Sequence, residues 1–369
     1  GLNALGQNTT ANANVAVGRN CLISNTTGTN LVAMGAYALD ANTTANNNTA
    51  IGYNALTFNT TGADHTAIGA NALEANTTAS SNTAIGRNAL ADTTTGGENV
   101  AIGSNAQPSS TTATRNVAIG VTSLNSCTDG SAHVAIGYQA MFSNTTGSSN
   151  VAIGYRALKD STTTTNSVAI GDDALGSTTT ASNNVAVGYH ALISNTTGAS
   201  NTAVGKGALD ANTTANGNTA VGDTTLGANT TGGENTATGF AALGNNTTAS
   251  KNTAFGYYAL LTNTTGGSNT ACGEVSLELC TTGSNNVGIG KGALQNVTTG
   301  DANHGIGHNA GNDITTGQNN ICLGGSAGRS ISPGGAITTG SNRVVLGNDD
   351  TTDLFCADTS ISSSDSRDK

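Results

Sequence analysis

The 369-residue sequence contains no tryptophan, only two prolines, 3% aromatic residues and 9% charged residues. A chain with so few large side chains lacks the material for a thick globular core, although its length would ordinarily correspond to two or more domains. Its apolar residues recur strictly instead of being sparse, which separates it from ordinary disordered chains. The composition therefore predicts an ordered but thin fold.

Two further absences limit the function. No run of 18 or more apolar residues exists and the N-terminus lacks the basic and apolar regions of a signal peptide, so we expect no membrane insertion. A net charge of −10 without clustered Lys and Arg argues against a nucleic-acid partner. Because Gly1 already lies in the repeat register, we expect the chain to begin inside a longer protein.

A glycine recurs every 17 residues from Gly1 to Gly324, twenty glycines in one register. With this glycine as position 1, the units share the text G-x-N-A-L-x-x-N-T-T-G/A-x-x-N-T/V-A-I/V. A fixed period of this kind is the signature of a stacked repeat protein. Like residues then form ladders along the stack, represented by Gly52, Leu56, Thr60, Thr61, Ala67, Ile68 and Asn82.

The segment N-T/V-A-I/V-G has the β-branched residues of a strand and no helical spacing, and N-T-T-G is a turn cluster. We therefore predict an all-β parallel β-solenoid or β-roll with one 17-residue repeat per turn. At a rung spacing of about 4.8 Å the rod is on the order of 90 Å long. Alternation places Thr49 and Ile51 on one face and Ala50 on the other, and we expect Ile51 and Leu56 inside the coil.

A single chain of such thin rungs is marginal in stability, because each rung buries little apolar surface against a large loss of backbone entropy. The near-constant Ala at positions 4 and 16 suggests a smooth surface on which chains pack, and we predict a homotrimer. Three regions follow from the period: the uninterrupted solenoid at 1–324, an insertion plus a last rung at 325–347, and a tail at 348–369.

The text N-T-A-I-G-x-N-A-L, at 82–90 and in a close variant at 201–209, resembles the repeats in the heads of trimeric autotransporter adhesins. It is more similar still to the repeat shafts of phage and virus tail fibres. The resemblance covers residues 1 to about 347. Adhesin heads of this kind are left-handed parallel β-rolls bundled in threes, so the resemblance implies a self-assembling rod.

The tail at 352–369 resembles the junction between phage tail fibres or spikes and their self-cleaving intramolecular chaperone domain. The motif S-D-x-R-x-K carries the likeness, and it places the scissile bond between Ser364 and Asp365. The family's chaperone needs about a hundred further residues, so we expect no cleavage activity in the residues present. The alternative is a polar tail with chance similarity.

The cysteines and histidines are better explained as members of the repeat columns than as parts of a metal or catalytic site. Five of the six cysteines occupy repeat positions, so each is most simply explained as one small buried residue in place of another. We expect their thiols to be reduced. His65 and His133 replace the Asn of position 14 four rungs apart, and His304 and His308 are expected at the surface. Strings such as Gly288-Ile289-Gly290-Lys291-Gly292 lack the helix of a phosphate loop. We expect no metal, no cofactor and no enzymatic activity.

The Asn-Thr-Thr triplets allow two interpretations. They are glycan acceptor sequences, which matters in a secreted eukaryotic protein, and they are turn formers, which we favour for a bacterial or phage protein. The adjacent Thr columns at positions 9 and 10 also resemble the threonine ladders of ice-binding β-solenoids, although adjacent threonines place only one column outward.

The sequence as a whole predicts a structural tail-fibre shaft that attaches a phage or virus to its host and is assembled in the host cytoplasm. The alternatives are a bacterial trimeric surface adhesin or extracellular filament at the cell surface and, as a lesser candidate, an ice-binding solenoid. A host cell-surface receptor is an expected partner beside the chain itself. Candidate contacts are the aromatic residues Tyr138, Phe142, Phe240, Tyr257 and Tyr258.

Overall fold

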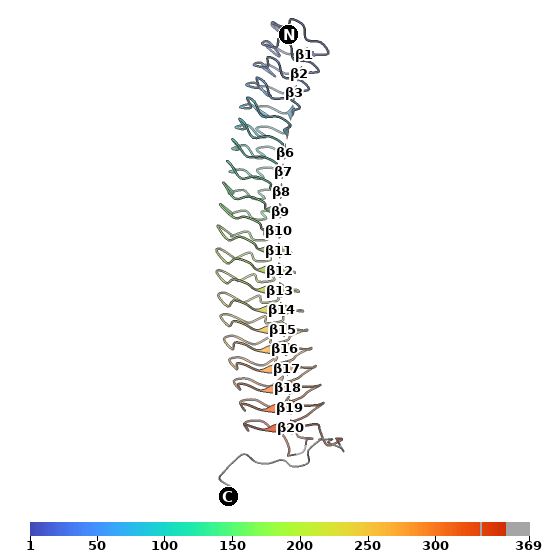
Figure 1. The fold of residues 1–369 in the computed structure, drawn as a ribbon, viewed down its shortest axis with the longest axis vertical. Helices are drawn as coiled ribbons and strands as arrows, with labels where there is room; N and C mark the ends of the chain where they lie inside the picture. The colour runs from blue at the N-terminus through green and yellow to red at the C-terminus, as the bar shows by residue number, and fades with distance from the viewer. Residues whose placement is uncertain (333, 352–369) are drawn as a thin grey trace, which may run out of the picture.

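The computed structural model describes residues 1–332 and 334–351. Within them the chain forms twenty short strands and no helix, wound into one gently curved rod with the N-terminus at one end (Figure 1). The predicted all-β parallel β-solenoid with one 17-residue repeat per turn is confirmed.

Each turn contributes one three-residue strand, and the strands stack along one side of the rod (Figure 1). Their bounds are β1 Val15–Val17, β2 Val32–Met34, β3 Thr49–Ile51, β4 Thr66–Ile68, β5 Thr83–Ile85, β6 Val100–Ile102, β7 Val117–Ile119, β8 Val134–Ile136, β9 Val151–Ile153, β10 Val168–Ile170, β11 Val185–Val187, β12 Thr202–Val204, β13 Thr219–Val221, β14 Thr236–Thr238, β15 Thr253–Phe255, β16 Thr270–Cys272, β17 Val287–Ile289, β18 His304–Ile306, β19 Ile321–Leu323 and β20 Val344–Leu346.

Each strand from β2 to β19 pairs in parallel with the strands of the turns before and after it, and β1 and β20 each pair with one neighbour. In β3 and β4, for example, Ala50 lies beside Ala67 and Ile51 beside Ile68. The offset is 17 residues until β19 and β20, where Ile321 pairs with Val344 across the longer C-terminal unit. The pairing makes a single sheet in which equivalent residues form straight columns.

The periodic glycine follows each strand and turns the chain away from the sheet. Gly52 has a φ of +143°, a conformation that side chains disfavour. A Cβ added at Gly52 would lie 2.4 Å from the carbonyl oxygen of Gly69 in the next turn. Backbones of successive turns therefore approach too closely for any other residue, which explains why the period is marked by glycine.

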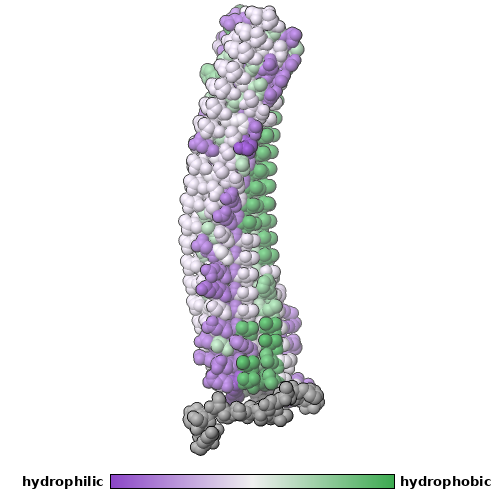
Figure 2. Space-filling model, in the orientation of Figure 1, coloured by the Kyte–Doolittle hydropathy of each residue, from purple (hydrophilic) through white to green (hydrophobic). Residues whose placement is uncertain are grey.

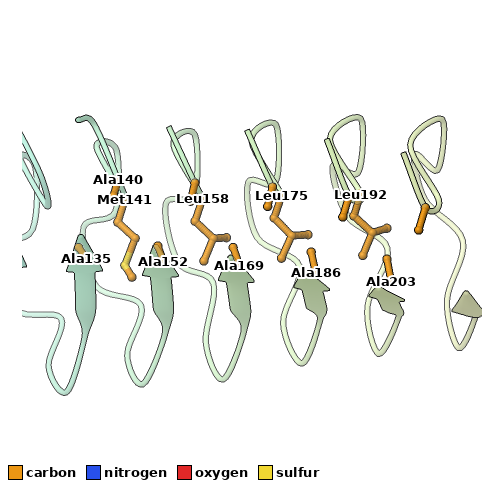
Figure 3. Close-up of a cluster of buried hydrophobic side chains, with 14 of the residues drawn as sticks. Ala135, Ala140, Met141, Ala152, Leu158, Ala169, Leu175, Ala186, Leu192 and Ala203 are labelled. Atoms are coloured by element: carbon orange, nitrogen blue, oxygen red, sulfur yellow. The ribbon is translucent and has the colours of Figure 1, made fainter. Parts of the chain in front are cut away.

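The strand faces are opposite to those we expected. Ala50 is fully buried, whereas Ile51 remains partly exposed on the outer face of the sheet. Figure 3 shows Leu158, Leu175 and Leu192 reaching toward the strand alanines. The leucine at position 5 fills the narrow interior from the opposite wall, so only a methyl group fits at position 16.

The expected packing surface of alanines at positions 4 and 16 is also wrong. Ala55 at position 4 and Ala67 at position 16 are both fully buried. Alanine lines the interior of each chain because the coil is thin, and it presents no surface to a second chain.

The unit after Gly324 is longer than the other units, and its additional residues contact the preceding turn. Arg329 pairs with Asp313, whose other carboxylate oxygen accepts a hydrogen bond from the Ser330 amide at 3.1 Å. Ile337 then enters the interior at 1% exposure, and β20 continues the sheet. The predicted cleavage junction at Ser364 and Asp365 lies outside the described residues.

Candidate functional site: the side-chain columns of the rod

The predicted ladder residues divide between the interior and the surface. Leu56 and Ala67 belong to the apolar half of the interior, and Asn82 belongs to a polar half. Gly52 forms the turn after β3, and Ile68 lies on the outer face of the sheet. The columns therefore separate into those that hold the coil together and those available to a partner.

The two threonine columns have different roles. The hydroxyl of Thr60 at position 9 donates to the carbonyl oxygen of Thr77 in the next turn at 3.0 Å, and its side chain is half-buried. Thr61 at position 10 is exposed. Only one threonine column is therefore free on the surface, as the adjacent spacing predicts.

Asparagine at position 14 joins successive turns. The amide nitrogen of Asn82 donates to the Gly96 carbonyl at 2.9 Å, and its oxygen accepts from the Asn99 backbone amide at 2.9 Å. The side chain thus satisfies buried backbone groups in the next turn, which would otherwise be costly. The column that Asn82 represents therefore bonds mainly to the backbone of the next turn.

A second asparagine column, at position 8, lies inside the coil from Asn25 onward. Asn42 donates to the Asn25 side-chain oxygen at 3.0 Å and to the Ala45 carbonyl at 3.2 Å. Repetition gives a ladder of side-chain amides, which we had interpreted only as turn formers. The signal was present in the sequence, because asparagine recurs at position 8 in most units.

Burial of this column bears on the Asn-Thr-Thr triplets. The acceptor Asn42, Asn59 and Asn76 are each 0% exposed, with their nitrogens donating within the ladder. A glycan attached to that nitrogen would have to occupy the interior. The folded coil is therefore incompatible with glycans at these positions.

The position-8 ladder is interrupted where the asparagine is replaced. Within the described residues, Asn76 and Asn263 are the last members of their runs, and the oxygen of each is buried without a hydrogen-bond partner. Thr93 and Cys280 occupy the next turns. Each interruption therefore removes the donor that the preceding amide needs.

The two buried histidines substitute for position-14 asparagine. His65 Nε2 lies 2.6 Å from the Ala79 carbonyl, and its Nδ1 accepts from the Asn82 backbone amide at 3.1 Å. This pattern fixes the neutral ring with its proton on Nε2. Burial lowers the pKa of His65 and of His133, which makes the same two contacts.

Four cysteines are buried, as expected for small residues in the columns. Burial raises the pKa of Cys127 and of Cys280 to about 12, which leaves both thiols protonated and unreactive at neutral pH. Cys272 differs from our expectation because it is exposed at the end of β16. Cys356 lies outside the described residues.

No described group of three or more His, Cys, Asp or Glu side chains could hold a metal ion. His304 and His308 are both exposed, on β18 and just after it. Across residues 1–332 and 334–351 there is likewise no helix of the length and hydrophobicity needed to cross a bilayer.

Several aromatic residues named as receptor candidates form exposed stacks. The rings of Tyr138 and Tyr155 stack with centroids 5.5 Å apart, and those of Phe240 and Tyr257 are 5.6 Å apart. Tyr258 packs on Tyr257, whereas Phe142 is half-buried. The stacked rings project beside the strands, at the position that follows the periodic glycine.

The outer face of the sheet runs the length of the described rod. Positions 15 and 17 of every strand point outward and carry mainly Val or Thr and Ile or Val. Even in the folded chain Val17, Phe255 and Ile306 are 54%, 42% and 43% exposed. Figure 2 shows the resulting apolar band along the side where the strands lie in Figure 1. We call this surface, formed by positions 15 and 17 of β1 to β20, the sheet face.

No protein-family model and no curated protein matches the chain.

Proposed function

We propose that the chain is the non-catalytic shaft of a fibre, a phage or virus tail fibre that attaches the particle to its host. The observation that carries the proposal is the unbroken stack of twenty in-register turns. In a rod built from one repeated unit, the number of units sets the length of the fibre, and the side-chain columns hold each turn to the next. Self-association, which we expect to give a homotrimer, completes the shaft.

Attachment is assigned to residues that differ from turn to turn. The stacks around Tyr138 and Phe240 are exposed, and aromatic side chains are enriched in binding surfaces. We therefore propose them as contacts to a receptor on the host cell. The location that follows is the virion tail, after assembly in the host cytoplasm and cleavage at Ser364 and Asp365.

A bacterial adhesin or extracellular filament is the second candidate, favoured by the N-T-A-I-G text. Antibodies raised against the purified rod and applied to particles and cells of the source sample distinguish the two. Label at particle tails supports the fibre, and label over cell surfaces supports the adhesin. Absence of label from both, or a globular particle by negative-stain microscopy, would overturn both.

Ice binding is the weaker third candidate. The hydroxyl of Thr60 is engaged with backbone, which leaves the single exposed column that contains Thr61. A thermal-hysteresis assay at micromolar protein tests it, and we expect no activity.

A further inference from the structure

We propose that the sheet face is the interface on which copies of this chain associate, parallel and in register. The inference rests on the proposed self-assembling shaft and adds to it the surface used and the direction of the partner. The surface follows from burial: the alanines we had assigned to contacts between chains are inside, and β-branched residues take their place outside.

The size of the sheet face is that of a stable interface. Three residues of strand span about 10 Å, and nineteen intervals of about 4.8 Å span about 90 Å, so the face covers about 900 Å². Monomers rarely expose a continuous apolar patch larger than a few hundred Å². Specific complexes bury about 800 Å² on each partner. The face is therefore about as large as the surface that one partner buries in a specific complex, and its column 17 is apolar along most of that length.

The regularity of the sheet face identifies that partner as another copy. Ile51, Ile68 and Ile85 follow one another at the spacing of paired strands. A partner that packs between them at every turn needs the same spacing over the same length. A second copy of this chain has both.

The parallel arrangement follows from the proposed homotrimer. Three copies that use the same face along its whole length surround one axis parallel to the rod, and rotation about that axis leaves every chain pointing the same way and in register. The same rotation sets column 15 of one copy beside column 17 of its neighbour at each turn. The valines at position 15 of β6 to β11 then meet isoleucine or valine.

Cys272 gives a direct test, because it is an exposed thiol on the sheet face. In parallel copies the Cys272 thiols lie at one height and close together. In antiparallel copies β16 faces β5, eleven turns away, so the thiols are about 50 Å apart. The Cys356→Ser chain, treated with a short bis-maleimide, should therefore give covalent dimers, and Cys272→Ser should abolish them.

Three further variants make each outcome decisive. Ile170→Cys, added to the Cys272→Ser chain, places a thiol on β10 near the middle of the rod and should link in either direction. Linking there but not at Cys272 would overturn the parallel arrangement.

The sheet face can also be tested by charge. The double variant Ile119→Lys and Ile153→Lys should reduce the sedimenting mass to that of one chain while keeping the circular dichroism spectrum. The matched exposed pair Thr146→Lys and Thr180→Lys should leave the oligomer intact.

The remaining outcomes separate this inference from the proposed shaft. If the chain sediments as an oligomer but neither thiol links and the lysine pair changes nothing, the shaft stands and the sheet face is not its interface. A monomeric rod at all concentrations would overturn self-association altogether. Thermal hysteresis by such a monomer, abolished by the lysine pair, would assign the face to ice and overturn the inference.

Discussion

Most asparagines at position 8 donate two hydrogen bonds inside the coil. Asn246 donates to the Asn229 oxygen at 2.8 Å and to the Ala249 carbonyl at 3.0 Å. Buried amides of this kind stabilise through the penalty for leaving a neighbour without its donor. The interior of the rod therefore depends on polar side chains as much as on leucine.

Asn246→Asp tests that dependence. The change keeps the shape of the side chain but removes both donated bonds and places a carboxyl group against two oxygens. We expect a loss of about 3 kcal/mol in the free energy of unfolding, measured by chemical denaturation. Asn46→Asp is the matched control, since Asn46 is exposed and uses its oxygen to accept from Thr29. Equal losses in the two variants would contradict the role of the ladder.

Cys280→Asn should have the opposite effect. An asparagine there restores the donor that the buried oxygen of Asn263 lacks. It also keeps a donor for the Gly283 carbonyl, to which the Cys280 thiol now donates at 3.4 Å. We expect stabilisation of about 1 kcal/mol, seen as a raised midpoint in the same denaturation experiment. A lowered midpoint would show that the site lacks room for the amide.

The buried histidines make stability depend on pH in a defined window. Their pKa is lowered from 6.5 by burial, so above about pH 6.5 both rings are neutral whether the chain is folded or unfolded. As the pH falls below that value, the unfolded chain binds protons that the folded chain excludes, and stability decreases until the folded rings protonate.

The expected observation is a melting temperature that falls from pH 7.5 to pH 5.5. The double variant His65→Asn and His133→Asn restores the residue found in other turns and should show a smaller fall over the same range. Identical pH profiles for the two proteins would remove the histidines as the cause.

At the scale of the turn, the periodic glycine is the element that permits stacking. Gly171 has a φ of +135°, and a Cβ there would lie 2.4 Å from the Gly188 carbonyl oxygen. Gly171→Ala should therefore destabilise by more than about 2 kcal/mol and increase amide hydrogen exchange in β10 and its neighbours. Gly325→Ala meets no atom within 4 Å and should leave exchange unchanged.

The fold of the turn was predictable from the sequence because a rigid period forces every unit into one geometry. The faces of the strand were not. Alternation shows that Ala50 and Ile51 point to opposite sides, but it does not say which side is inside. Size favoured the isoleucine, whereas the interior is already filled by Leu56 from the opposite wall. That choice depends on the width of the coil, which no single turn of sequence encodes.

The candidate interface was missed for the same reason. With alanine assigned outside, positions 4 and 16 were the natural contact surface, and the structure places both inside. The polar interior was half predicted: position 14 was identified as a ladder, whereas position 8 resembled a turn. Burial of Asn42 and its equivalents follows from the path of the whole coil, since each bonds to residues of two turns.

At the scale of the whole molecule, each turn contacts mainly the turns before and after it, so stability is a sum of nearest-neighbour terms. Removing whole units should therefore shorten the rod and leave the fold intact. Deletion of residues 137–221 removes five units and joins Ile136 to Gly222, which makes β8 and β14 neighbours. We expect a rod shorter by about 24 Å in solution scattering, with an unchanged circular dichroism spectrum per residue.

The matched control removes fewer residues but breaks the register. Deletion of residues 137–213 joins Ile136 at position 17 to Thr214 at position 10, so the first unit after the junction has no glycine turn and no position-8 amide. We expect lower stability and hydrogen exchange that spreads from the junction, whereas the in-register deletion should melt as one transition. If both deletions behaved alike, the stability of the rod would not depend on keeping the 17-residue register, and the composition of the units alone would account for it. The rod would then owe its order to contacts that do not follow the 17-residue unit.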